Sequence, residues 1–586
     1  MSPPAPIALD YRNTNSVWGS VLVETLHRLG LRHAVISPGS RSTPLTMAFA
    51  RHRGVESIPV LDERSAAFFA LGLAKRTQRP VVVLCTSGTA GANYFPAVIE
   101  AQESGVPLIV ITADRPPEMR ECRSGQTIDQ QKLFGSHVNF YHELALPGAS
   151  LPILRYLRQT IIEAWERSQW PGLGPVHLNA PFRDPLPPFA DGSTKALKKQ
   201  LDAVEFFSAV QPPHRLLSRI EQTGFPVNKR GLIIAGPMDH ALAPIDAGIM
   251  AGMAYDLGWP VLADGLSGMR GDADRYPAMI TRYDAILRSS KAARQLKPEV
   301  VLCIGGWPVS KTLRAWLEAA APEVWMVTNR AQNLDALHLR TRHVRCGLWA
   351  FAESIASSEW RHDAYTRLWQ TADAAAGRAL AQGLAKAHED FEGAVVPRLA
   401  AQLPAQTPVM VANSMPVRDV EFFWPANDLG HQVFFNRGAN GIDGTLSTAL
   451  GIAHAGGPTI LLTGDLALLH DANGFLLRPK LRGSLTVVLI NNDGGGIFEH
   501  LPVAQFNPPF EEFFATPQQV DFRKLCAAHQ VRHVRVRDRA HLARLVTRLP
   551  DRGIRVLEVR TDRKRDAAFR QKLFAAAARA VEQALR

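Results

Sequence analysis

Short apolar runs rich in β-branched residues recur along the chain and alternate with longer helical stretches. Most of these runs are closed by Gly, Pro, Ser, Asp or Asn. Runs of this length without polar alternation are typical of strands buried on both faces of a parallel sheet. The helical stretches between them have the length that crossover connections need. The pattern therefore predicts an α/β fold whose strand-end loops carry polar residues.

The runs fall into three blocks, which predicts three consecutive α/β domains, each with a central, mostly parallel sheet. The predicted domains are residues 1–190, 201–360 and 375–586, with a polar linker near 191–200 and an Ala-rich helical segment at about 373–403. The predicted strands are 33–37, 81–86 and 108–112; 231–236, 259–264, 300–305 and 324–329; and 409–412, 433–436, 459–463, 485–491 and 554–559.

The composition is that of an ordinary globular protein, with 46% hydrophobic and 20% charged residues. No apolar run approaches the roughly 20 residues that span a bilayer. Residues 1–10 are Pro-rich and lack the basic-then-apolar pattern of a secretion signal. The five cysteines have no paired spacing, which is typical of reduced thiols. We therefore expect a cytoplasmic protein without membrane insertion.

The net charge of +12 leaves more than one interpretation open. A basic protein attracts nucleic acid or acidic lipid, but no stretch interleaves Lys and Arg with aromatic residues, so we expect no nucleic-acid partner. The charge is alternatively a solvated basic surface, partly in the tail 560–586. In a third interpretation, some arginines converge on anionic substrates.

Two strand ends in the third block carry oxygen ligands. Asp465 follows one apolar run and Asn492 the next, 27 positions later. This spacing suits a strand, a crossover helix and the next parallel strand, so both side chains are expected at one edge of a sheet. A carboxylate, an amide oxygen and the carbonyl of Gly494 would suit a hard cation such as Mg²⁺. The alternative is a pair of ordinary strand-end turns, where Gly-Asp and Asn-Gly are common.

Gly464-Asp465-Leu466, followed by Asn491-Asn492, resembles the thiamine-diphosphate signature of the decarboxylase and carboligase superfamily. The signature usually has Gly where this chain has Leu466, and this difference narrows the choice among the families of the superfamily. The resemblance implies thiamine diphosphate held through Mg²⁺ or Mn²⁺. It implies that the metal is bound by Asp465, Asn492 and Gly494, and the cofactor also by Gly464 and Leu466.

The superfamily also requires a glutamate after a strand of the first domain. This carboxylate hydrogen-bonds the pyrimidine ring and thereby favours loss of the thiazolium proton. Glu63, in the segment 60–64, matches it, with Asp62 and Arg64 expected to support it. The alternative is a helix-start carboxylate favoured by the helix dipole. Ile442 matches the bulky aliphatic residue that bends the cofactor; the alternative is an ordinary core isoleucine.

Further segments resemble one family, 2-succinyl-5-enolpyruvyl-6-hydroxy-3-cyclohexene-1-carboxylate (SEPHCHC) synthase of menaquinone and phylloquinone biosynthesis. They occur in the family's order and span nearly the whole chain, and Leu466 also suits this family. The segments are 36–45, 86–90, 112–117, 126–130, 308–311, 413–414, 436–444 and 495–498.

The family resemblance implies a transferase reaction. 2-Oxoglutarate adds to the cofactor carbanion and loses CO₂, and the four-carbon unit attacks isochorismate in a 1,4-addition. Both substrates carry two carboxylates, which arginine binds bidentately. The implied substrate residues are the cations Arg41, Arg115, Lys311, Arg418 and Arg437, the neutral hydrogen-bonding residues Ser40, Gln126 and Ser414, and an apolar wall of Ile497, Phe498 and Leu501.

Each of these residues has a structural alternative. A strand-end arginine can simply cap a helix, and Phe498 can be a core residue. Beyond Glu63 no further protein acid or base is assigned, although His500 lies near the apolar wall.

In the superfamily, each site is shared by the first domain of one subunit and the third domain of another, which implies a homodimer or homotetramer. The central domain has no glycine-rich dinucleotide fingerprint, so we predict no flavin there. Two other functions remain open: an acetohydroxyacid synthase-like carboligase acting on pyruvate, and a non-catalytic binding paralogue.

Overall fold

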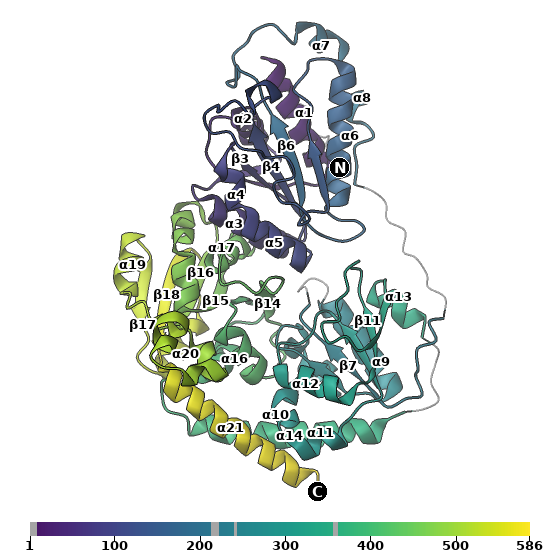
Figure 1. Cartoon of the computed structure of the whole chain (residues 1–586), viewed down its shortest axis with the longest axis vertical. Coiled ribbons are helices and arrows are strands. Elements are labelled where there is room, and N and C mark those ends of the chain that lie inside the picture. Colours follow the sequence, from purple (N-terminus) through teal and green to yellow (C-terminus); the bar gives the residue numbers. More distant parts are fainter. Residues whose placement is uncertain (1–8, 213–221, 239–242, 356–360) are drawn as a thin grey trace. The chain divides into compact units, whose positions relative to one another are not determined.

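The computed structural model describes residues 9–212, 222–238, 243–355 and 361–586 (Figure 1). Residues 1–8 of the Pro-rich N-terminal stretch lie outside this part of the chain. The described residues form three six-stranded sheets, and every strand pair in them is parallel. This confirms the predicted fold class of three α/β domains with parallel sheets.

The first sheet has the strand order β2-β1-β3-β4-β6-β5. Its strands are β1 (His33–Ile36), β2 (Glu56–Pro59), β3 (Val81–Cys85), β4 (Leu108–Asp114), β5 (Phe140–Glu143) and β6 (Val176–Pro181). One face is covered by α1 (Thr14–Leu29), α2 (Thr43–Arg51) and α6 (Leu151–Arg167). Against β1 and β3 packs α3 (Glu63–Thr77), which also contacts α5 (Phe95–Ser104).

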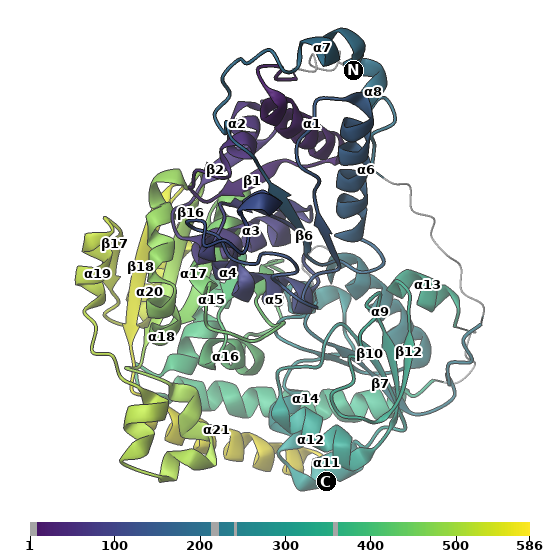
Figure 2. The ribbon, with the colours of Figure 1, turned by 45° about the horizontal axis from the view of Figure 1, so that its top comes forward.

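Helix α3 also packs closely along α17 (Thr445–Gly456) (Figure 2). A Cβ atom on Gly72 would lie 2.0 Å from the carbonyl oxygen of Thr448, and one on Gly451 would lie 2.2 Å from that of Phe69. The two backbones therefore touch, and only glycine permits the approach at these positions.

The described residues form two compact units. The first unit holds the described residues up to 212, together with Asn436–Gly456 and Asp471–Arg482, and so includes the first sheet, α17 and the 3₁₀ segment η5 (Ala472–Lys480). The second unit holds the other two sheets.

The second sheet has the order β12-β11-β10-β7-β8-β9. Its strands are β7 (Gly231–Ala235), β8 (Val261–Ala263), β9 (Met279–Ile280), β10 (Val300–Ile304), β11 (Glu323–Val327) and β12 (Arg340–Val344). One face packs on α9 (Ala243–Leu257) and α13 (Leu348–Glu353). The opposite face packs on α10 (Tyr283–Leu287), α12 (Lys311–Ala320) and α14 (Asp363–Ala385).

The third sheet has the order β14-β13-β15-β16-β18-β17. Its strands are β13 (Pro408–Val411), β14 (Gln432–Phe435), β15 (Thr459–Gly464), β16 (Ser484–Asn491), β17 (Arg532–Arg535) and β18 (Gly553–Arg560). Its core includes α15 (Val395–Gln402), α16 (Met415–Phe423), α20 (Arg539–Thr547) and α21 (Arg563–Ala584). Helix α21 also packs along α14, which joins the cores of the second and third sheets (Figure 1).

Shorter helical segments complete the described structure. They are α4 (Thr89–Asn93), α7 (Lys195–Gln200), α8 (Ala203–Phe207), α11 (Ser290–Gln295), α18 (Asp465–His470), α19 (Phe522–Ala528), η1 (Pro117–Met119), η2 (Met269–Gly271), η3 (Ala273–Arg275), η4 (Glu392–Ala394), η6 (Gly496–His500), η7 (Pro502–Gln505) and η8 (Glu511–Ala515). Helix α7 occupies the second half of the predicted polar linker. Within the described residues, none of the helices has the length and apolarity to cross a membrane.

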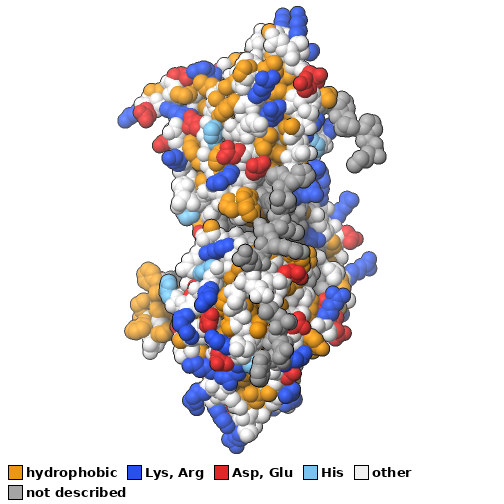
Figure 3. Space-filling model, turned by 90° about the vertical axis from the view of Figure 1, so that its right-hand side faces the viewer, with side chains coloured by type: hydrophobic (Ala, Val, Ile, Leu, Met, Phe, Trp, Pro, Cys, Tyr) orange, Lys and Arg blue, Asp and Glu red, His pale blue; other side chains and the backbone are white. Residues whose placement is uncertain are grey.

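On the face of the molecule drawn in Figure 3, Lys and Arg side chains are interspersed with Asp and Glu side chains. None of the five cysteines forms a disulfide.

Candidate functional site

Glu63 is the first residue of α3, directly after the N-cap residue Asp62. The Asp62 carboxylate accepts a hydrogen bond from the Ser65 amide (2.9 Å) and another from Asn473 Nδ2 (2.7 Å). The first contact satisfies an N–H group at the helix start, as N-caps do. Through these two hydrogen bonds, Asp62 holds the start of α3, where Glu63 lies, as its predicted supporting role requires.

The Glu63 side chain is partly exposed and, within the described part of the chain, makes no hydrogen bond. It lies near two buried groups, Cys85 at the end of β3 and Tyr94. Burial, with a smaller contribution from the Glu63 carboxylate, raises the pKa of Cys85. Burial first, and also the charges of Cys85 and Glu63, raise the pKa of Tyr94. The Glu63 oxygens thus keep hydrogen-bonding capacity that no described residue uses.

Arg41 is 7% exposed and follows β1. Its backbone N–H donates to Thr86 Oγ1 (3.2 Å) and its Nη1 donates to the Phe182 carbonyl (2.9 Å), with Asp184 3.7 Å away. Its Nε atom is buried and has no hydrogen-bond partner among the described residues. A buried donor without a partner is costly, so an anionic ligand would complete this guanidinium.

A second arginine lies close to Arg41. Burial first, and then the charge of Arg115, lowers the pKa of Arg41. Arg115 itself donates to Ser87 Oγ (2.6 Å) and to the Gly125 carbonyl (2.7 Å). Two guanidinium groups near a sheet edge create a positive potential that favours carboxylates.

The neutral residues predicted beside these arginines are exposed. Gln126 Nε2 donates to the Ser87 carbonyl (3.1 Å), so Gln126 and Arg115 both contact Ser87. Ser40 is exposed directly before Arg41. The structure therefore brings together four predicted substrate residues around the ends of β1, β3 and β4.

Arg437 and Ile442 lie in the loop that precedes α17, and both are partly buried. The buried carboxylate of Glu100 anchors this loop, because it accepts hydrogen bonds from the amides of Gly438 (3.0 Å) and Ala439 (2.7 Å). Farther along, the carbonyl of Ile442 accepts a hydrogen bond from Thr445 Oγ1 (2.8 Å). Ile442 is thus held at the start of α17.

At the third sheet, β15 and β16 are neighbours, with Thr463 paired to Leu489. Gly464 ends β15, and the buried Asp465 follows. The two Asp465 carboxylate oxygens accept hydrogen bonds from the amides of Leu466 (2.9 Å) and Gly494 (2.8 Å). Burial raises the pKa of Asp465 to about 6. The predicted pairing of these two strand ends is therefore present.

Gly494 is a glycine for two physical reasons. Its φ of 132° is strained for other residues, and a Cβ atom would lie 2.2 Å from the Ala515 carbonyl oxygen. Its own carbonyl accepts a hydrogen bond from the Gly496 amide (3.0 Å), which leaves a second lone pair on that oxygen.

Asn492 is 7% exposed, and its Nδ2 donates to Glu392 Oε2 (3.0 Å). Its Oδ1 is buried and has no hydrogen-bond partner among the described residues. A buried amide oxygen without a partner near a carboxylate suits a hard cation such as Mg²⁺. Among the described residues, no cluster of three or more His, Cys, Asp or Glu has the arrangement of a metal site.

Behind Asn492 lies a buried charge cluster that the sequence did not reveal. Arg570 Nη2 donates to Glu392 Oε1 (3.0 Å) and to Asp419 Oδ1 (2.6 Å). The Glu392 amide donates to Asp566 Oδ2 (3.0 Å). No local motif marks these residues, since Glu392 and Arg570 are 178 positions apart.

His500 lies beside this cluster, with its Nε2 3.2 Å from Arg570 Nη1. Although much of the residue is exposed, burial of its ring lowers its pKa to about 4, with further contributions from Arg570, Arg418 and Arg288. The ring is therefore neutral near pH 7, and its Nε2 accepts the hydrogen bond from Arg570.

Ser414 and Arg418 lie at the start of α16. Ser414 is the N-cap residue with a φ of 70°, a left-handed conformation that is uncommon for serine. Arg418 Nη1 donates to the Ser414 carbonyl (2.6 Å), so the two predicted substrate residues are in direct contact.

The predicted apolar wall follows β16. Ile497 and Phe498 are half-buried in η6, and Phe498 packs edge-to-face on Phe514 with ring centroids 5.8 Å apart. Leu501 follows directly and is also half-buried. Lys311 is the exposed first residue of α12, at the second sheet, and within the described residues it forms no ion pair.

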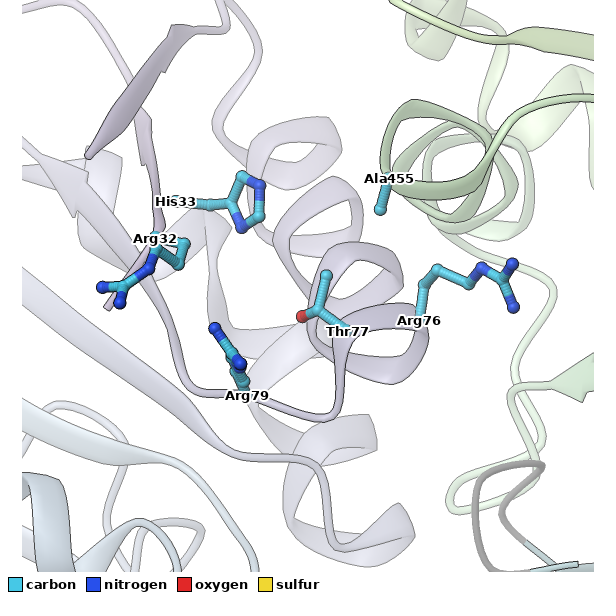
Figure 4. A pocket seen from close by; sticks show the side chains of 6 residues that line it. All are labelled: Arg32, His33, Arg76, Thr77, Arg79 and Ala455. Atoms are coloured by element: carbon cyan, nitrogen blue, oxygen red, sulfur yellow. The ribbon is translucent and has the colours of Figure 1, made fainter. Parts of the chain in front are cut away.

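A separate basic pocket of about 380 Å³ lies in the first unit (Figure 4). It is lined by Arg32, His33, Arg76, Thr77, Arg79 and Ala455, none of which is a predicted site residue. Arg32 already donates to the carbonyls of Leu31 (2.8 Å) and His27 (3.2 Å).

Three stretches of the chain match models of known protein families. Residues 18–133 match the family "Thiamine pyrophosphate enzyme, N-terminal TPP binding domain", and residues 419–559 match its "C-terminal TPP binding domain". Residues 196–411 match the "Middle domain of thiamine pyrophosphate" family. Thiamine pyrophosphate is thiamine diphosphate, so these matches agree with the predicted cofactor.

Curated relatives resemble the chain over nearly its full length. A protein of Gloeothece citriformis is 50% identical over 96% of this chain and 98% of its own. A protein of Trichormus variabilis is 51% identical over 97% and 98%, and one of Synechococcus elongatus is 50% identical over 97% of each chain. All three are named 2-succinyl-5-enolpyruvyl-6-hydroxy-3-cyclohexene-1-carboxylate synthase.

Proposed function

Because the chain belongs to the SEPHCHC synthase family of thiamine-diphosphate enzymes, we propose that it decarboxylates 2-oxoglutarate and adds the remaining four-carbon unit to isochorismate by 1,4-addition. It is a transferase of menaquinone or phylloquinone biosynthesis. The observation that carries the proposal is the buried Asn492 Oδ1, which has no hydrogen-bond partner among the described residues. It lies in the loop whose Gly494 amide donates to Asp465.

The oxygens of Asp465, Asn492 and Gly494 are proposed to hold Mg²⁺ or Mn²⁺, which would bridge the diphosphate. Gly464 and Leu466 would contact the diphosphate beside it. The Leu466 and Gly494 amides already hold the Asp465 carboxylate in a fixed orientation (2.9 and 2.8 Å). A preorganised carboxylate loses little conformational entropy when it binds a cation.

Thiamine diphosphate, when bound, supplies a nucleophilic carbon and an electron sink for decarboxylation. Glu63 is proposed to hold a proton between its carboxylate and a ring nitrogen of the cofactor. Its oxygens have no competing hydrogen bond within the described residues, which supports this role. Ile442, anchored at the start of α17, would support the bent cofactor from below.

The cationic residues are proposed to bind the substrate carboxylates. Arg41 is the strongest candidate, because its buried Nε has no partner in the described part of the chain. The side chains at the wall would exclude water from the reacting carbon. The proposed substrate residues are Ser40, Arg41, Arg115, Gln126, Lys311, Ser414, Arg418 and Arg437, with the wall formed by Ile497, Phe498 and Leu501.

The deciding experiment incubates the purified chain with 2-oxoglutarate and isochorismate and follows the product by mass spectrometry. We expect product only when thiamine diphosphate and Mg²⁺ or Mn²⁺ are both present. A parallel reaction replaces 2-oxoglutarate with pyruvate. Turnover of pyruvate without turnover of 2-oxoglutarate would favour an acetohydroxyacid synthase-like enzyme. Absence of any 2-oxoglutarate decarboxylation would favour a non-catalytic paralogue.

We further propose that the chain self-associates as a homodimer or homotetramer in the cytoplasm, and that residues 1–190, 201–360 and 375–586 are its domains. Each of these ranges contains one of the three sheets. Light scattering after size-exclusion chromatography measures the assembly, and a monomeric mass for the active enzyme would contradict it.

A further inference from the structure

The amide of Asn492 has two ends of opposite polarity, and only its oxygen can bind a cation. Rotation of the amide by 180° about its terminal bond exchanges oxygen and nitrogen at little steric cost. An asparagine that binds a metal through its oxygen therefore needs a neighbouring residue that pairs with its NH₂ group and not with its oxygen.

Glu392 is the neighbour in contact with this amide. Its Oε2 lies 3.0 Å from Asn492 Nδ2, and its side chain is 2% exposed. The Glu392 oxygen accepts a hydrogen bond from the NH₂ end of the amide, whereas the oxygen end of the amide has no proton to donate to it. The flipped amide would place two oxygens against each other.

Arg570 contacts the other carboxylate oxygen of Glu392. Its Nη2 donates to Glu392 Oε1 at 3.0 Å, and its side chain is 3% exposed. Charge-assisted hydrogen bonds in a buried environment are strong and orient both partners. The two oxygens of Glu392 are thus divided between one guanidinium and one amide.

The space around the amide is restricted as well. A Cβ atom on Gly496 would lie 2.6 Å from Asn492 Nδ2, so the nitrogen end is packed against the backbone of η6. The Asn492 Oδ1 is the atom left without a partner among the described residues. The arrangement presents oxygen, and not nitrogen, on the side away from Glu392.

We propose that Glu392 is a positioning residue that sets the polarity of the Asn492 amide, so that Oδ1 is offered to the metal that carries the cofactor diphosphate. The inference rests on the metal site proposed above. Outer residues that orient metal ligands typically contribute about 10- to 100-fold to metal affinity.

The test exchanges the polarity of this contact. Glu392→Gln is nearly isosteric but has one acceptor oxygen and one NH₂ donor. When the Gln oxygen faces Arg570, its NH₂ group faces Asn492 and pairs with the flipped amide, which then offers nitrogen to the metal. We expect the dissociation constant for Mg²⁺ in the presence of thiamine diphosphate, measured by calorimetry on the full chain, to rise about 10- to 100-fold.

The double variant Glu392→Gln/Asn492→Asp should restore binding. A carboxylate at position 492 accepts the Gln NH₂ group with one oxygen and offers the other oxygen to the metal. We expect its Mg²⁺ affinity to return to within about threefold of the wild-type value, and to exceed that of Glu392→Gln at least about tenfold. Glu392→Asp, which keeps the charge for Arg570 but withdraws the acceptor from Asn492, is expected to lose affinity as Glu392→Gln does.

Asp419→Asn is the matched control, because Asp419 contacts the same Nη2 atom of Arg570 (2.6 Å) but is not hydrogen-bonded to Asn492. We expect its Mg²⁺ affinity to stay within about threefold of wild type, and circular dichroism to show the same fold for all variants. Equal losses in Asp419→Asn and Glu392→Gln would assign the cluster a purely structural role and overturn the inference.

Two other outcomes also overturn it: wild-type Mg²⁺ affinity in Glu392→Gln, or a double variant no better than Glu392→Gln. In both, the wild-type enzyme still binds the cofactor in a Mg²⁺-dependent manner, so the proposed function stands. Cofactor binding by the wild-type enzyme that does not depend on a divalent metal would instead overturn the metal site and this inference together.

Discussion

The carboxyl ends of the first and third sheets carry two groups of polar residues that are organised in opposite ways. At the first sheet, Glu63 is partly exposed and makes no hydrogen bond within the described residues, and Arg41 retains a buried donor without a partner. At the third sheet, Asp465 and Glu392 have a hydrogen bond on each carboxylate oxygen. Asn492 Oδ1 beside them has no hydrogen-bond partner among the described residues.

This difference in hydrogen bonding suits the two regions to different ligands. A saturated network holds its atoms in one geometry, which suits a cation with strict demands on distance and number of oxygens. Groups with free hydrogen-bonding capacity suit proton transfer and substrates that change shape and charge during a reaction. Variants at the first sheet should therefore alter turnover or substrate binding, and variants at the third sheet should alter cofactor retention.

Replacement of the acid gives the largest expected effect. Glu63→Gln removes the transferable proton but retains the shape, so turnover should fall about 10²- to 10⁴-fold. Cofactor affinity, measured by calorimetry, should change only a few-fold. Glu118→Gln, an exposed carboxylate paired with Arg183, serves as the control and should retain full turnover. Near-wild-type turnover in Glu63→Gln would show that Glu63 is not the acid. The proposed difference between the first and third sheets would then lose its main support.

Replacement of the buried carboxylate at the third sheet should act on binding. Asp465→Ala is expected to raise the dissociation constant of thiamine diphosphate about 100-fold or more, because a metal-ligand oxygen is lost. Asp493→Asn changes an exposed neighbour in the same loop and should leave this constant nearly unchanged. Unaltered cofactor affinity in Asp465→Ala would show that this region does not hold the metal.

Arg41→Lys keeps the positive charge but loses the planar guanidinium that binds carboxylates bidentately. We expect KM for one of the two substrates to rise about tenfold with a smaller change in kcat, as measured by initial rates. Arg51→Lys, at an exposed arginine that pairs with Asp10 (3.0 Å), is the control. A fall in kcat with unchanged KM would assign Arg41 to the chemical step instead.

The smallest effect concerns a buried carboxylate in the first unit. Burial raises the pKa of Asp471 from 3.8 to about 7. Between these values the folded protein binds more protons than the unfolded chain, so this group lowers stability as pH rises from about 4 to 7. Asp471→Asn removes that penalty and can still pair with Ser447, the present partner of both carboxylate oxygens.

Thermal unfolding should therefore give similar midpoints for the wild type and Asp471→Asn near pH 4. At pH 8 the variant should be higher by a few degrees, at about 2–4 °C per kcal/mol. A gap of equal size at both pH values would show that the carboxylate does not titrate in this window.

Much of the fold was predictable because interior strands consist of uninterrupted apolar residues. Every predicted run forms a strand of one of the three sheets. The strands that were missed include the edge strands β12 and β17, which are rich in Arg and His because one side faces solvent. Strand β6 is interior but carries His177 and Asn179. In the folded chain, His177 Nε2 pairs with Thr112, and Asn179 Oδ1 accepts hydrogen bonds from Thr112 and Gln130.

The site was predictable to the extent that its chemistry is local in the sequence. Asp465 and Asn492 could be placed together because adjacent parallel strands bring their ends to one edge. Glu392, Asp419 and Arg570 could not, because they meet only through the packing of α16, α21 and η4. A buried Arg in an otherwise charged terminal helix has no distinguishing pattern in the sequence.

The glycine contact between α3 and α17 has a consequence for the acid at the other end of α3. Gly72 lies nine residues from Glu63, about 13 Å along the helix axis. A tilt of about 5° at this contact would swing the carboxylate by about 1 Å, and a misplacement of that size can lower a catalytic rate about 100-fold. The close backbone contact at Gly72 and Gly451 thus helps to fix the position of the Glu63 carboxylate, although the contact itself lies away from the reacting atoms.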